Sequence, residues 1–321
     1  MGSAGRIYVK EITMKLRKHS QWVRLIAATM VLALPALESV HAAELRQPIA
    51  SSVGSYVPAG YSVVFNDEFN DTQLNREKWA TRYIYANGTL DRLTSEAQVY
   101  RDNANHLMYD GMLSLTARRV GAGYESGMIR SRWEFKPSSS TSYYLEARVR
   151  MPDGKGVFPA FWLNSGYSPT GKLYWGPEID IFEFVVDGVE ENPSSRPKNM
   201  VHSGAVTHAG RIPSALTYAH PNYQRAWNLF WAPSDLTADF HTYGLLWTET
   251  GIAFYVDGVR TNARTYQWIY DNDGKPAGPA HILLNLAIGG DWAGRHGIDD
   301  NAFPQALDID WVRVYRKTTL P

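Results

Sequence analysis

Cysteine is the residue type that this chain lacks altogether: none of its 321 residues is one. The absence excludes disulfide bonds and thiolate metal sites, so stability has to come from a packed core. A net charge is also missing, since 32 basic residues balance 32 acidic ones. Nucleic acid and anionic membranes are therefore not expected partners. The balance argues against a heavily sulfated ligand as well, although a local basic patch could still bind one.

Long apolar runs are scarce too. The clearest apolar run, residues 25–37, has 13 residues. A membrane-spanning helix needs about 20. The run follows several basic residues and precedes the small residues Val40 and Ala42, which suit cleavage by a signal peptidase. The sequence predicts a signal peptide over residues 1–42 and a secreted protein, extracellular or periplasmic. An uncleaved membrane anchor is the alternative.

Beyond the signal peptide we expect a short polar segment and one long domain. Residues 43–60 are rich in serine, glycine and proline, which is typical of a linker or a loosely attached leader. Residues 61–317 show short alternating segments between turn signals and no long helical period. The clearest predicted strands cover residues 112–117, 144–151, 242–247, 252–256, 281–288 and 308–315. Many short strands without interleaved helices predict an all-β sandwich of two antiparallel sheets.

A further predicted strand carries three carboxylates in an apolar run, Glu178-Ile179-Asp180-Ile181-Phe182-Glu183. Ionised side chains in a buried strand lose hydration, so this arrangement is costly unless it has a use. Side chains alternate along a strand, so Glu178 and Asp180 share a face. Glu183 shares it only if a β-bulge adds one residue. Ile179 and one of Ile181 or Phe182 would then face the core.

The acids of this strand suggest a specific chemistry. Two carboxyl groups that flank a scissile bond are the equipment of a glycosidase, and in retaining enzymes they lie about 5–5.5 Å apart. Mutual repulsion among three neighbouring carboxyl groups favours a proton on one of them near neutral pH. The alternative is a solvated edge strand with a calcium-binding or surface role.

This motif resembles the bulged form of the active-site signature of glycoside hydrolase family 16, which includes laminarinases, agarases and carrageenases. The resemblance covers roughly residues 61–316. Other segments similar to the family are residues 65–69, 96–100, 124–127, 239–244, 255–258, 284–290 and 310–315. The resemblance implies a β-jelly roll of the concanavalin A type, with a substrate cleft on its concave face.

The resemblance also implies catalytic roles. Glu178 matches the family's nucleophile and Glu183 its acid/base, and Asp180 between them would orient the nucleophile. Glu183 would hold the shared proton, because like-charged neighbours raise the pKa of a carboxyl group. No cofactor is expected for catalysis.

Binding residues follow from the same comparison. Trp162 and Trp175 bracket the approach to the acidic strand and would stack on sugar rings. His202 matches a family histidine that faces the carboxylates. Residues 185–238 form a long stretch expected to wall the cleft in part.

A structural calcium ion is a further expectation from the resemblance. In many relatives it ties the first strand to the last, and the matching side chains here are Glu68 and Asp310. Carboxylate oxygens suit this hard cation. A plain interstrand hydrogen-bonding role for the two residues is the alternative.

We therefore expect a secreted, retaining endo-glycosidase that hydrolyses a β-linked polysaccharide. The first expectation is a β-1,3-glucan of the laminarin type, and a β-galactan such as agarose or porphyran is second. A non-catalytic glycan-binding module is the alternative from another class, but such relatives typically lack one catalytic glutamate. The expected partner is the polysaccharide alone, with no membrane after signal cleavage, and the protein is expected to be a monomer.

Overall fold

The computed structural model describes residues 55–93, 95–102, 104–166, 176–186, 198–206, 228–270 and 275–318. They form two large sheets and very little helix. All strand pairs in the described part of the chain are antiparallel except β3 with β6.

The larger sheet has 10 strands, in the order β15-β14-β13-β8-β19-β5-β6-β3, with β1 on β19 and β4 on β5. Its strands are β1 (Ser62–Asp67), β3 (Gln98–Tyr100), β4 (His106–Tyr109), β5 (Met112–Val120), β6 (Gly123–Ser126), β8 (Thr141–Arg150), β13 (His241–Trp247), β14 (Gly251–Val256), β15 (Val259–Thr265) and β19 (Gln305–Thr318).

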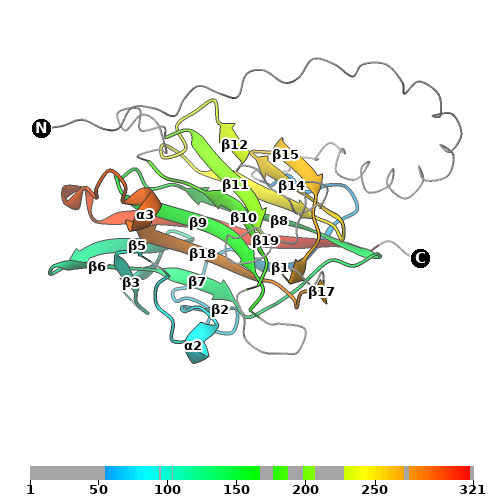
Figure 1. Ribbon diagram of the computed structural model, residues 1–321, viewed down its shortest axis with the longest axis horizontal. Helices are drawn as coiled ribbons and strands as arrows, with labels where there is room; N and C mark the ends of the chain where they lie inside the picture. The colour runs from blue at the N-terminus through cyan, green and yellow to red at the C-terminus, as the bar shows by residue number, and fades with distance from the viewer. Residues whose placement is uncertain are drawn as a thin grey trace, which may run out of the picture.

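The smaller sheet has 7 strands, in the order β12-β11-β10-β9-β18-β7-β2, and most of them lie side by side in Figure 1. Its strands are β2 (Trp79–Ala80), β7 (Met128–Ser131), β9 (Val157–Asn164), β10 (Glu178–Glu183), β11 (Met200–Val206), β12 (Asn228–Trp231) and β18 (His281–Ile288). The remaining elements are β16 (Ile269–Tyr270), β17 (Lys275–Pro276), α2 (Tyr85–Gly88), α3 (Gly290–Ala293) and the 3-10 turn η1 (Asp300–Ala302).

The expected strands are present. The predicted strand over residues 281–288 coincides with β18, and the predicted hairpin of residues 242–247 and 252–256 is the paired β13 and β14. The prediction of an all-β sandwich of two sheets is confirmed.

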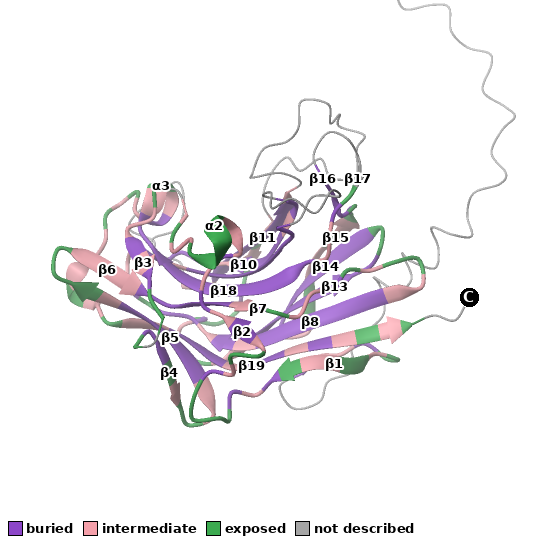
Figure 2. Cartoon of the chain, turned by 90° about the horizontal axis from the view of Figure 1, so that it is seen from below, coloured by how far each residue is buried: buried purple, intermediate pink, exposed green. Residues whose placement is uncertain are grey.

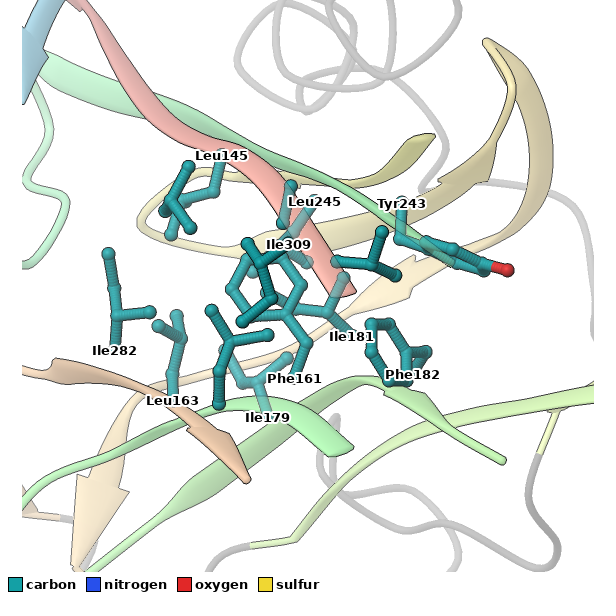
Figure 3. Close-up of a cluster of buried hydrophobic side chains, with 14 of the residues drawn as sticks. Leu145, Phe161, Leu163, Ile179, Ile181, Phe182, Tyr243, Leu245, Ile282 and Ile309 are labelled. Atoms are coloured by element: carbon teal, nitrogen blue, oxygen red, sulfur yellow. The ribbon is translucent and has the colours of Figure 1, made fainter. Parts of the chain in front are cut away.

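The hydrophobic core lies between the two sheets, and Figure 2 shows β8 and β18, one strand from each sheet, coloured mainly as buried. Central members such as Leu145, Phe161 and Ile309 have no exposed surface. Figure 3 shows side chains from both sheets meeting there. Burial of each large aliphatic or aromatic side chain stabilises the fold by about 1.5–3 kcal/mol, and this layer fixes the orientation of every strand that crosses it.

The segment just before β1 packs against the larger sheet on the side away from this core. Val57 and Tyr61 contact a cluster there that includes Tyr144 and Tyr255. The buried Glu146 on β8 accepts hydrogen bonds from the Ser55 hydroxyl and, at 3.0 Å, from the Tyr56 backbone N–H. Residues 55–61 are thus held to the domain.

None of the helices in the described ranges has the length and apolar character of a membrane-spanning segment. The predicted signal peptide, residues 1–42, lies outside the described residues, as do residues 43–54 of the predicted leader. Both assignments stay predictions.

Candidate active site

The acidic strand β10 lies inside the smaller sheet, between β9 and β11. Along β9, Asp180 pairs with Trp162 and Phe182 pairs with Phe161, so Ile181 is an extra residue without a partner of its own. The pairing with β11 shifts over the same stretch. The predicted β-bulge is confirmed.

The bulge brings the three acids to one face of the sheet. Glu178, Asp180 and Glu183 pair with alternate residues of β9, namely Asn164, Trp162 and Ala160. Directly paired residues of antiparallel strands point to the same side. The intervening residues of β9, Phe161 and Leu163, are fully buried in the core. We call the opposite face of this sheet, which carries the three acids, the acidic face.

The core side of the bulge differs from the expectation in one respect. Only one of Ile181 and Phe182 was expected to face inward, but both are in the core, with 2% and 0% of their surfaces exposed. Figure 3 shows both side chains within the cluster, beside Tyr243. A bulge permits this because two consecutive residues stand opposite one residue of the neighbouring strand. Two apolar anchors therefore hold the short segment between Asp180 and Glu183.

The electrostatics favour bound protons in the acidic strand. Burial, and then the charges of Glu178 and Glu183, raise the pKa of Asp180 well above its usual range. Burial and the charge of Glu178 raise the pKa of Glu183 to about 8. A carboxyl group with such a pKa is protonated at neutral pH and can serve as an acid.

Asp180 lies where it can orient Glu178. Its side chain is hydrogen-bonded to that of Glu178, and it is 3% exposed. A protonated Asp180 would donate in this bond, leaving Glu178 ionised and fixed in position. The orienting role that the resemblance implied for Asp180 stays a prediction.

Tyrosine hydroxyl groups surround the Glu178 end of the acidic strand. The Tyr85 hydroxyl donates to Asn164 Oδ1 at 2.7 Å, and Asn164 is the β9 partner of Glu178. Burial, followed by the negative charge of Glu178, raises the pKa of Tyr85. Tyr266 lies on the core side of the sheet, where its hydroxyl donates at 3.0 Å to the carbonyl of Val206, the β11 partner of Glu178. Burial is the main cause of the raised pKa of Tyr266. Both phenols therefore keep their protons and are hydrogen-bond donors, a feature that no sequence signal indicated.

His202 lies at the Glu183 end of the strand. It is the β11 partner of Glu183, so it shares the acidic face, as expected. Burial lowers its pKa to about 4, so the imidazole is neutral near neutral pH. Its ring makes an edge contact with Trp292 of α3, with centroids 4.9 Å apart. A role for His202 in binding substrate stays a prediction.

The two predicted stacking tryptophans have different outcomes. Trp162 is on the acidic face next to Asp180, but it is only 5% exposed. Its indole N–H donates to Asn285 Oδ1 at 2.7 Å, and its ring packs near Tyr83. Trp175 lies outside the described residues, as does most of residues 185–238. Their roles in binding stay predictions.

The proposed calcium ligands are each paired with an arginine. Glu68 accepts two hydrogen bonds from Arg313, at 2.9 and 2.7 Å. Asp310 accepts one from Arg148 at 2.5 Å. Guanidinium groups already neutralise both carboxylates, and the described ranges hold no cluster of three or more metal-binding side chains. This arrangement does not suit a cation shared by Glu68 and Asp310, and we derive no role from one.

Comparisons with known proteins cover almost all of the described domain. The family model described as "Beta-porphyranase A-D, GH16 domain" matches residues 62–317. A β-glucanase of Rhodothermus marinus is 31% identical, over 80% of this chain and 85% of that protein. The glucan endo-1,3-β-glucosidase A1 of Niallia circulans is 29% identical, over 81% of this chain but 38% of that protein.

A solved structure shares the fold. The laminarinase from Flavobacterium sp. UMI-01 superimposes with a TM-score of 0.60 at 27% identity, covering 79% of this chain and 100% of that chain. The expected β-jelly roll is confirmed by this likeness together with the two-sheet sandwich.

Proposed function

Because the chain belongs to glycoside hydrolase family 16, a retaining family, we propose that it cleaves a β-1,3-glucan within the polysaccharide chain. The observation that carries the proposal is the bulge that places Glu178, Asp180 and Glu183 on one face of the sheet. The names of the two relatives, a β-glucanase and a glucan endo-1,3-β-glucosidase, favour the glucan.

In this proposal the two glutamates act in turn. Glu178 attacks the anomeric carbon while Glu183 donates its proton to the departing glycosidic oxygen. The bond to the leaving sugar breaks and an ester to Glu178 forms. Glu183, now ionised, then takes a proton from water, which attacks the same carbon and releases Glu178. Two inversions retain the configuration at that carbon.

The pKa values support this division of labour. Glu183 starts protonated because its pKa is about 8, as the donor step requires. After proton transfer its charge adds to the negative field around Asp180, which raises the cost of a second ionised group there. Asp180 therefore stays protonated through the cycle and keeps Glu178 oriented.

A β-galactan is the second candidate, and the match to the β-porphyranase model favours it. Arg130 on the acidic face gives it structural support. Arg130 pairs with Leu283, Leu283 with Trp162, and Trp162 with Asp180. Arg130 therefore lies in the same row across the sheet as Asp180. Its Nε donates to the Arg82 carbonyl at 3.2 Å, so the two residues are neighbours. Guanidinium groups at this place suit a sugar with an anionic substituent.

Export and oligomeric state belong to the same proposal. The predicted signal peptide supports secretion, and polysaccharides too large to enter a cell need an exported enzyme. We expect the exported chain to start at Ala43 and to be a monomer. Mass spectrometry of the secreted protein and light scattering would check both; a retained residue 1–42 segment would contradict export by cleavage.

The substrate test is the release of reducing sugar from laminarin, mixed-linkage glucan, agarose and porphyran. We expect laminarin to be degraded to a ladder of oligosaccharides, with an early fall in viscosity that marks internal cleavage. The Glu178→Gln variant is the blank for each substrate. Release from porphyran or agarose alone would replace the glucan by the second candidate, and binding without release would indicate a glycan-binding module.

A further inference from the structure

Trp231 is the one exposed tryptophan among the residues that the structure describes, with 57% of its surface open to solvent. It ends β12, the edge strand of the smaller sheet (Figure 1). An exposed indole on an edge strand adds an apolar surface that favours unwanted association. This exposed indole is therefore a candidate site for binding a ligand.

The strand pairing shows which way Trp231 points. Trp231 pairs with Met200, Phe230 with Val201 and Leu229 with His202. Phe230 packs against the core between the sheets. Side chains alternate along a strand, so Trp231 and Leu229 point to the other side. That side is the acidic face.

The same pairing gives the distance of Trp231 from the acids. His202 pairs with Glu183 on one side and with Leu229 on the other, so these three residues form one row across the sheet. Trp231 lies in the next row on the strand that carries Leu229. Two strand spacings and two residues along β12 place its Cα about 12 Å from that of Glu183. A short oligosaccharide spans this distance.

An apolar surface continues from the acids toward Trp231. Trp292 contacts the His202 ring, and Leu229, 46% exposed, lies beyond His202 in the same row. The surface runs across the strands. A glycan whose scissile bond lies at Glu183 and that runs across the sheet would pass over it.

We propose that Trp231 is an outer sugar-binding platform, on which a pyranose ring of the polysaccharide stacks at the edge of the acidic face. The inference rests on the proposed function, since the occupant is the substrate of that site. The C–H faces of a sugar suit the indole because they are apolar, while the hydroxyl groups at the ring's edge stay in water. A rigid aromatic side chain also binds at a low cost in conformational entropy.

The test is the variant Trp231→Ala, assayed on laminarin and on a series of laminari-oligosaccharides. We expect kcat/KM on the polymer and the longer oligosaccharides to fall about tenfold, mostly through KM, which corresponds to about 1.4 kcal/mol. For an oligosaccharide too short to extend from the scissile bond at Glu183 to Trp231, kcat/KM should stay within about twofold. Trp231→Phe should recover most of the loss.

The matched control is Tyr109→Ala, which removes an exposed aromatic ring from the edge strand β4 of the other sheet. It should leave every substrate unaffected. Equal loss on short and long substrates, or no loss on either, would overturn the role of Trp231 while leaving the proposed function intact. A change of oligomeric state in Trp231→Ala, seen by light scattering, would instead assign the residue to contact with a second copy.

Failure of the proposed function can be recognised separately. If the wild-type protein cleaves none of the four polysaccharides, its retardation in gels containing laminarin or porphyran still tests the platform. Loss of retardation in Trp231→Ala, but not in Tyr109→Ala, would support sugar binding without catalysis. Equal retardation of all three proteins would overturn the inference.

Discussion

At the scale of single residues, Glu183 is held in a state that favours chemistry over stability. It is a half-buried carboxyl group at the end of an otherwise buried strand that carries two other acids, and its pKa is raised to about 8. The immediate cause is burial, followed by the charge of Glu178. An ordinary glutamate in water would be ionised at neutral pH and useless as a proton donor.

The pKa of Glu183 predicts an alkaline limit to activity. The donor must be protonated in the free enzyme, so kcat/KM should fall as the pH rises through about 8. Initial rates on an aryl β-glycoside with a poor leaving group, measured across this range, would show it. When Glu183→Gln is assayed on a glycoside whose good leaving group needs no proton, the fall of kcat/KM at alkaline pH should disappear. If the alkaline fall of kcat/KM persists in that variant, the titrating group is not Glu183.

The same residue predicts a gain in stability when its charge is removed. Glu183 has an ordinary pKa of 4.5 when unfolded and about 8 when folded. Between these values the unfolded state binds fewer protons, so its ionisation lowers the stability of the folded state as the pH rises. Glu183→Gln should therefore raise Tm by several degrees at pH 8 and change it little at pH 4. An equal shift at both pH values would contradict the linkage.

At the scale of elements, the bulge in β10 decides which face Glu183 shares. Ile181 is the added residue, and both it and Phe182 are in the core. Without the bulge, regular alternation would turn Glu183 to the face opposite Asp180. Because Ile181 and Phe182 both point into the core, Glu183 returns to the face of Asp180.

Changes in strand length provide a matched pair of variants. Deletion of Ile181 leaves Glu178, Asp180 and Glu183 at alternate positions, so measurable hydrolysis should remain despite the loss of a buried side chain. Deletion of Ile179 also removes one buried side chain, but it makes Glu178 and Asp180 adjacent, so Glu178 turns toward the core and hydrolysis should be abolished. Rates on laminarin, with Tm to show that both variants fold, would decide. Equal rates in two folded variants would mean that hydrolysis does not require the acids to share one face of the strand.

The sequence was sufficient for the parts of the site that lie on one strand. Alternation and the cost of buried charge were enough to predict the bulge and the common face of Glu178, Asp180 and Glu183. Local alternation also predicted β18 and the hairpin of β13 and β14.

Other parts of the site depend on which strands become neighbours. Trp231 reaches the acidic face because β12 pairs with β11, and Tyr85 reaches Asn164 from a distant segment. No local pattern encodes either contact. The burial of Trp162 has the same origin, since Tyr83 comes from outside β9.

At the scale of the whole molecule, residues 55–61 pack on the outer side of the larger sheet and cover part of it. Glu146 is fully buried there, with hydrogen bonds from Ser55 and Tyr56. The Tyr56 ring lies against Gly258, where a Cβ atom would meet it at 2.4 Å. The chain has no cysteine, so noncovalent contacts, and no disulfide bond, hold this segment to the sheet.

Removal of residues 1–61 should therefore destabilise the domain. Glu146 would lose the hydrogen bonds from the removed segment and keep that from Tyr315, and an incompletely satisfied buried polar group costs about 1–3 kcal/mol. Combined with lost apolar contacts, this should lower Tm by about 5–10 °C relative to a chain that starts at Ala43. Glu146→Leu in the shortened chain should restore part of the loss by removing the unsatisfied group. An unchanged Tm in the shortened chain would show that the segment contributes nothing.

The central claim, that β10 presents a nucleophile and an acid/base to the same sugar, can be tested by azide rescue. The variants Glu178→Ala and Glu183→Ala are given an activated aryl β-glycoside and sodium azide, and NMR identifies the anomer formed. Azide in the space left by Glu178 attacks opposite the leaving group, so we predict the α-glycosyl azide. In Glu183→Ala the ester to Glu178 still forms and azide replaces it, so we predict the β-glycosyl azide. The control Glu125→Ala removes a carboxylate on β6 of the other sheet, where it pairs with Arg101 at 3.1 Å, and should form neither. The same anomer from both variants, or rescue of neither, would contradict the account.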